Sequence, residues 1–166
     1  MDYERFMTKA LQQAQAALAA GEFPVGCVMV YENRIIASGA RVGTTGDCTN
    51  EIDHAEMIAL RRLINLKANI NHREVTLFST LEPCLMCFGA LMISNIGKII
   101  FAYEDAMGGG TQCDITKLPP LYKKKQISVI PNILRQKSLQ LLKAFFSNPE
   151  NNYLKDSLLA TYTLCQ

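Results

Sequence analysis

The sequence has little of several features that would point to a particular partner or compartment. Only two of its 166 residues are histidine, His54 and His72, which sharply limits any metal site. No uncharged apolar run approaches the roughly 18 residues that cross a bilayer. The first ten residues, MDYERFMTKA, lack the apolar core of a signal peptide. The net charge of +2 is smaller than the basic excess usual in dedicated nucleic-acid binders. We expect a cytoplasmic protein with no membrane partner.

Cysteine is better represented than histidine. Cytoplasmic thiols stay reduced, so we expect free thiols or metal ligands and not a disulfide framework. The six positions are Cys27, Cys48, Cys84, Cys87, Cys113 and Cys165. Cys27 lies in an apolar run and is expected in the core, whereas Cys48 and Cys113 lie in predicted loops.

The order of apolar patterns predicts an α/β fold. Helical spacing predicts helices over 2–20, 54–66, 84–94, 132–146 and 150–163. Short apolar runs predict strands over 25–31, 34–38, 74–79, 98–103 and 126–130. This alternation favours a sheet of about five strands with helices on its faces. We expect one domain over 1–166, with a core of about 3–146 and a helical extension over 147–166.

Two cysteines two residues apart pose the main chemical question. Cys84 and Cys87 follow Pro83 at the start of a predicted helix, where they share one face. Unpaired backbone N–H groups and the helix dipole favour thiolates at that end. A metal pair is the leading interpretation, and a redox pair or a core pair is the alternative.

His54 and Glu56 suggest how a metal site would be completed. A catalytic zinc takes three protein ligands and leaves a fourth position to water. His54 opens a predicted helix and is a candidate third ligand, although a lone histidine there is more often a cap or a surface residue. Glu56 and His54 can reach one point only if it lies beyond the end of their helix. A carboxylate there can take and return a proton.

Three motifs resemble the cytidine and deoxycytidylate deaminase superfamily. They are Glu22-Phe23-Pro24-Val25-Gly26, His54-Ala55-Glu56 and Thr80-Leu81-Glu82-Pro83-Cys84-Leu85-Met86-Cys87. Within it, the chain looks most like bacterial tRNA adenosine deaminases and their guanine deaminase relatives. The resemblance implies a three-layer α/β/α sandwich with a five-stranded mixed sheet, usually a homodimer. It implies one Zn²⁺ per chain on His54, Cys84 and Cys87, with Glu56 as the proton shuttle of a hydrolytic deamination.

The resemblance also implies a base pocket and a substrate. The backbone around Pro24, Val25 and Gly26, and around Leu81, Glu82 and Pro83, matches its walls. The leading substrate is adenosine in tRNA; the alternative is a free base or nucleoside such as guanine or cytosine. A catalytically silent zinc-binding subunit is a lesser alternative.

The chain departs from the family in three places. Arg41 stands where relatives carry an asparagine that contacts base or ribose; it either meets a phosphate or purine carbonyl, or is a solvated loop residue. Lys123-Lys124-Lys125 replaces a basic element of the tRNA enzymes and either contacts phosphate or forms a solvated turn. In the C-terminal extension, Tyr153 or Tyr162 either closes over a pocket or packs against the core.

Overall fold

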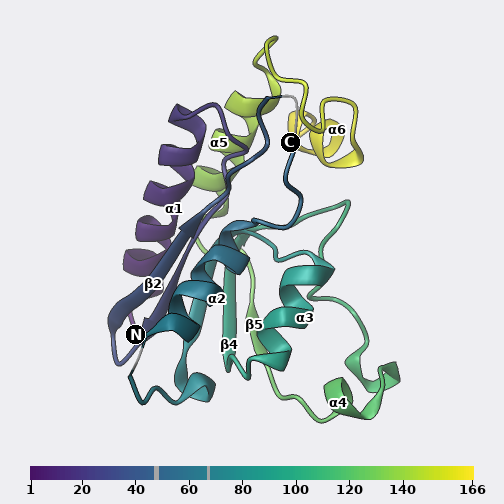
Figure 1. The fold of residues 1–166 in the computed structure, drawn as a ribbon. Helices are drawn as coiled ribbons and strands as arrows, with labels where there is room; N and C mark the ends of the chain where they lie inside the picture. Colours follow the sequence, from purple (N-terminus) through teal and green to yellow (C-terminus); the bar gives the residue numbers. More distant parts are fainter. Residues whose placement is uncertain (47–48, 67) are drawn as a thin grey trace.

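The computed structural model describes residues 1–46, 49–66 and 68–166 (Figure 1). The strands are β1 (Gly26–Tyr31), β2 (Arg34–Ala40), β3 (Thr76–Leu81), β4 (Lys98–Tyr103) and β5 (Ser128–Ile130). The α-helices are α1 (Tyr3–Ala19), α2 (Ala55–Asn65), α3 (Leu85–Ile93), α4 (Pro120–Lys123), α5 (Arg135–Phe146) and α6 (Leu158–Leu164). Within the described ranges, no helix has the length and apolarity to span a bilayer.

The strands form one mixed sheet in the order β2-β1-β3-β4-β5. β1 runs antiparallel to β2 and β3, whereas β3, β4 and β5 run parallel. Leu81 at the end of β3 pairs with Tyr103 at the end of β4. The carboxyl ends of these two central strands therefore share one edge of the sheet. Open α/β sheets commonly bind ligands at that edge.

Helices cover both faces of the sheet. α1 and α5 pack on one face, and α2 and α3 lie on the other (Figure 1). Alternate strand residues divide accordingly, with Val28 and Phe78 in the core under α1 and Met29 and Leu77 in the core on the other face. The predicted three-layer sandwich and its five-stranded mixed sheet are confirmed.

A glycine lets α2 begin very close to the sheet. A Cβ built on Gly39 of β2 would lie 2.0 Å from the carbonyl oxygen of Ala55, the first residue of α2. Any side chain there would push the helix away. The contact holds the amino end of α2, and with it His54, against the edge of the sheet.

Two predicted helix starts were wrong. The helix predicted from 132 begins at Arg135, because Asn132 and Leu134 have left-handed backbones (φ 70° and 57°). The helix predicted from 150 begins at Leu158. Before it, the Asn148 and Asn151 side chains accept hydrogen bonds from backbone N–H groups two residues on. These local bonds favour turns over a helix.

The described cysteines are all free, as expected. Cys27 is fully buried in the core, and Cys113 and Cys165 are exposed. Cys48 lies outside the described residues.

Candidate active site

Three predicted metal ligands meet in one place. The Nδ1 atom of His54 lies 3.5 Å from the Cys84 sulfur and 3.6 Å from the Cys87 sulfur. Ligand atoms of the three residues all lie within 4.8 Å of one another. Residues 30 and 33 positions apart in the chain are thus brought to a single point.

Two helix ends create this meeting point. His54 is the N-cap of α2 and Cys84 is the N-cap of α3, while Cys87 lies in the first turn of α3. Neither cap side chain bonds to its own helix backbone, so both are free to face the shared point. Partial positive charge at both helix ends stabilises anionic ligands there.

The geometry and chemistry fit a zinc ion. A tetrahedral zinc with bonds of about 2.0–2.3 Å to nitrogen and sulfur places its ligand atoms about 3.5–3.8 Å apart. The observed nitrogen–sulfur separations of 3.5 and 3.6 Å match. One imidazole and two sulfurs form a usual ligand set for zinc and leave one position of the four to water. Among the residues that the structure describes, no fourth Cys, His, Asp or Glu joins this group.

The two cysteines shift each other's pKa in opposite directions. The hydrogen bond from Cys87 lowers the pKa of Cys84 to about 4, and His54 assists. The same contact with Cys84, together with burial, raises the pKa of Cys87. The hydrogen bond to Cys84 also raises the pKa of His54. The lowered pKa of Cys84 favours a thiolate, which attracts a cation to the site.

Glu56 lies beside the ligands without joining them. Its carboxylate is 3% exposed; Oε1 accepts a hydrogen bond from the Ser79 hydroxyl at 2.8 Å, and Oε2 lies 3.7 Å from the Cys87 sulfur. Burial raises the pKa of this carboxyl group. A carboxyl group with a raised pKa can both accept and donate a proton near neutral pH.

A pocket of about 190 Å³ opens over these residues. Its volume is below the roughly 300–1,000 Å³ of pockets that take drug-sized ligands, so it suits one small ring system. It is lined by Phe23, Val25, Arg41, Glu51, His54, Ala55, Glu56, Leu81, Glu82, Cys84, Asp105, Met107, Gly108, Tyr153, Leu154 and Leu159.

The residues expected at the pocket divide into two groups. Val25, Arg41, Leu81 and Glu82 line it, whereas Pro24, Gly26 and Pro83 do not. A Cβ on Gly26 would lie 2.4 Å from the Ala14 backbone nitrogen, so this glycine serves the packing of α1.

The buried Glu82 carboxylate organises the loop after β4. It accepts hydrogen bonds from the backbone N–H groups of Asp105 and Thr111, both at 3.2 Å, and from the Thr111 hydroxyl. Asp105 lines the pocket, and burial raises the pKa of its carboxyl group. The sequence interpretation missed Asp105, which follows β4 without any motif of its own.

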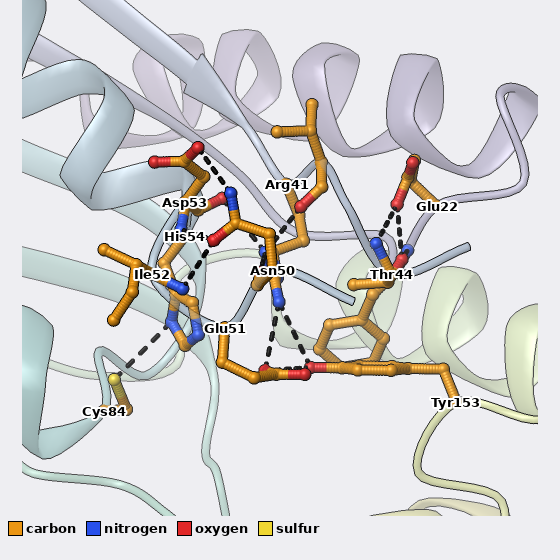
Figure 2. Close-up of polar contacts among 12 residues, drawn as sticks. Glu22, Arg41, Thr44, Asn50, Glu51, Ile52, Asp53, His54, Cys84 and Tyr153 are labelled. Atoms are coloured by element: carbon orange, nitrogen blue, oxygen red, sulfur yellow. Dashed lines mark hydrogen bonds and ion pairs between the residues drawn. The ribbon is translucent and has the colours of Figure 1, made fainter. Parts of the chain in front are cut away.

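Arg41 is not a solvated loop residue, and that alternative was wrong. Its side chain is 2% exposed. Figure 2 shows it among the residues that lead to His54, with Glu51 and Tyr153 beside it. Tyr153 both lines the pocket and packs against Phe23, with ring centroids 5.6 Å apart.

The lysine run lies far from the pocket. Lys123 ends α4, which lies at the opposite end of the molecule from α6 (Figure 1). Lys125 donates a hydrogen bond to the Asn95 side chain at 2.6 Å. This placement favours the solvated turn over contact with a substrate in the pocket of the same chain.

Comparison with known proteins connects this geometry to a family. A model of the cytidine and deoxycytidylate deaminase zinc-binding region matches residues 1–103. The chain is 32% identical to a tRNA-specific adenosine deaminase of Bacillus subtilis over 146 residues, covering 86% of this chain and 88% of that protein. It is 29% identical to tRNA-specific adenosine deaminase 2 of Xenopus laevis, covering 95% of this chain and 93% of that one.

Solved structures give the same picture. A structure from a study of A-to-I editing by tRNA:A34 deaminases superposes with a TM-score of 0.68 at 25% identity, covering 82% of this chain and 98% of that one. Guanine deaminase from Bacillus subtilis superposes with a TM-score of 0.56 at 30% identity, covering 63% of this chain and 66% of that one.

Proposed function

The chain belongs to the cytidine and deoxycytidylate deaminase family, and on that premise we propose that it hydrolytically deaminates adenosine in tRNA. The similarity to tRNA-specific adenosine deaminases over most of both chains carries the choice of substrate. The gathering of His54, Cys84, Cys87 and Glu56 at one small pocket supports the chemistry.

In this proposal, His54, Cys84 and Cys87 would hold a zinc ion, whose charge two thiolates and one neutral imidazole would balance. The bound ion would lower the pKa of a water at the site, which is the chemistry that it contributes. The pocket orients the base so that its amine-bearing carbon faces the site. Deaminases of this type extrude a base into such a pocket, because a stacked base is out of reach.

Glu56 moves the proton. Its carboxylate lies between Ser79 and the Cys87 sulfur, so it is held at the site without ligating. It takes a proton from the attacking water and returns it to the departing amine, which leaves as ammonia. The Ser79 hydroxyl fixes one carboxylate oxygen and leaves the other toward the ligands.

Ammonia release by the purified zinc-loaded protein tests the proposal. The panel contains an unmodified tRNA with adenosine at position 34, the same tRNA with guanosine there, nucleosides and free bases. Glu56→Ala serves as the blank. Release that requires the adenosine tRNA supports the proposal. Release from a small molecule alone refutes the tRNA substrate while keeping the deaminase chemistry.

A free base is the second candidate, and the C-terminal segment (residues 147–166) favours it. Tyr153, Leu154 and Leu159 of this segment add a wall to a small pocket. The lysine run, the candidate for contact with RNA phosphates, lies away from that pocket. The same panel distinguishes a free base from a tRNA.

We also propose a homodimer that pairs through α3. This helix reads LMCFGALMI, yet Leu85 and Ile93 on its outer side are 59% and 50% exposed. Gly89 lies between them at helical spacing, with open space where a Cβ would be. Apolar surface of this kind is typical of an interface. Light scattering of Ile93→Asp is expected to give the mass of a monomer.

We infer a cytoplasmic location, because exposed free thiols at Cys113 and Cys165 suit a reducing compartment.

A further inference from the structure

We propose that Arg41 is a positioning residue of the deaminase site. Its guanidinium fixes the backbone that presents His54 and, with Glu51 and Tyr153, holds the C-terminal segment as a wall of the pocket. This role rests on the proposed deaminase function. It differs from direct contact with phosphate or base, because the contacts described below already engage the guanidinium.

Three carbonyl groups surround one nitrogen of Arg41. Nη1 donates to the carbonyl oxygens of Val42 at 2.6 Å, Asn50 at 2.7 Å and Asp53 at 3.1 Å. These carbonyls belong to both ends of the loop between β2 and α2. The guanidinium therefore closes that loop from inside (Figure 2).

The closed loop ends at the zinc ligand. Asp53 directly precedes His54, and the Asn50 side chain accepts hydrogen bonds from the backbone N–H groups of Ile52 and Asp53 at 2.9 and 3.1 Å. His54 itself donates its backbone N–H to Ile52 at 2.9 Å. Loss of the guanidinium would free the Asp53 carbonyl and the peptide that sets the direction of the imidazole.

The second nitrogen reaches the C-terminal segment. Nη2 donates to the Glu51 carboxylate at 3.2 Å and to the Tyr153 hydroxyl at 3.3 Å. The Tyr153 hydroxyl in turn donates to Glu51 at 2.9 Å. Both Glu51 and Tyr153 line the pocket. Arginine suits this place because its rigid fork serves two sets of acceptors, which a single ammonium cannot do.

A second anchor of the same chemistry provides a control. The Tyr162 hydroxyl donates to Glu104 at 2.8 Å, and Glu104 forms an ion pair with Arg135. This anchor also holds the C-terminal segment, but none of its three residues lines the pocket. Equivalent changes at the two anchors therefore separate a role in the site from a role in general stability.

The first experiment compares Arg41→Lys with Arg135→Lys by competition for zinc with a colorimetric chelator. Residues that orient metal ligands typically contribute about 10- to 100-fold to metal affinity. We expect a weakening of that order for Arg41→Lys and none for Arg135→Lys. Equal zinc affinities of the two variants would overturn the positioning of His54. This measurement requires no substrate.

The second experiment compares Tyr153→Phe with Tyr162→Phe. Each change removes one hydroxyl and keeps the ring. We expect Tyr153→Phe to raise KM roughly 3- to 10-fold, as for one lost hydrogen bond, with kcat and zinc content preserved. Tyr162→Phe should leave KM unchanged. Equal KM values in the two variants would refute the role of Tyr153 in holding the C-terminal segment as a wall of the pocket.

Amide hydrogen exchange tests, without any need for turnover, whether Tyr153 holds the C-terminal segment in place. In Tyr153→Phe, the amides of 148–157 should exchange faster than in Tyr162→Phe. Inactivity of the wild-type protein on every substrate would refute the proposed function, while zinc affinity and hydrogen exchange would still decide the role of Arg41.

Discussion

Replacing Glu56 by glutamine removes a proton carrier and little else. The amide has nearly the shape of the carboxylate, and its oxygen can still accept the 2.8 Å hydrogen bond from Ser79. No zinc ligand is changed. Because Glu56 is 3% exposed, a neutral side chain there also removes the free-energy cost of burying a carboxylate. The variant should therefore fold and bind zinc like the wild type.

The expected effect is on turnover alone. General acid–base groups contribute typically about 10²–10⁴-fold to rate, which corresponds to roughly 2.7–5.4 kcal/mol of activation free energy. We expect kcat to fall within that range, measured as ammonia released under saturating substrate. Zinc per chain, by elemental analysis, and Tm should stay at wild-type values.

Glu82→Gln is the matched control. Glu82 is a second buried acid of the same pocket, but both its oxygens accept hydrogen bonds from the loop after β4. Its replacement should lower Tm and reduce kcat less than tenfold. If Glu56→Gln kept more than a tenth of wild-type kcat, or if the two variants lost the same activity, Glu56 would not be the proton shuttle.

Three further outcomes are expected. Cys87→Ala should lose zinc and lower Tm, because metal binding is coupled to folding; normal zinc content by elemental analysis would contradict the ligand assignment. Ser79→Ala should reduce kcat roughly 3- to 10-fold by releasing one oxygen of Glu56, with unchanged KM as the check. The hydrogen bond from Arg135 lowers the pKa of Glu104 from 4.5 to about 2. The resulting stability is present above pH 4.5 and is lost as the pH falls toward 2. Glu104→Gln should therefore be less stable than the wild type by roughly 1–2 kcal/mol at pH 7. Urea unfolding should show that this difference in the free energy of unfolding shrinks below pH 4.5.

The chemistry of the site could be predicted because it depends on local pattern. His54 and Cys84 begin helices, and Cys87 follows Cys84 by three residues. Thiols at a helix start are prepared for metal, because the unpaired backbone N–H groups there favour thiolates. The layers were predicted from another local pattern, the alternation of apolar strand segments with helical segments along the chain.

The anchoring of Tyr153 by Arg41 could not be predicted in this way. The hydrogen bond between Arg41 and Tyr153 joins residues 112 positions apart. Nothing near Arg41 in sequence indicates that three backbone carbonyls and a distant hydroxyl will surround it. The late start of α6 has a different, local origin: the side chains of Asn148 and Asn151 compete with the helix for backbone N–H groups.

The paired anchors of the C-terminal segment limit how this enzyme can be recombined with its relatives. A segment transplanted from another deaminase would meet Arg41 and Glu51 at one end and Glu104 and Arg135 at the other. Without tyrosines at matching places, both charge clusters would lose a hydroxyl. The exchangeable module is therefore the segment together with four residues outside it, and a successful chimera has to carry them as one unit.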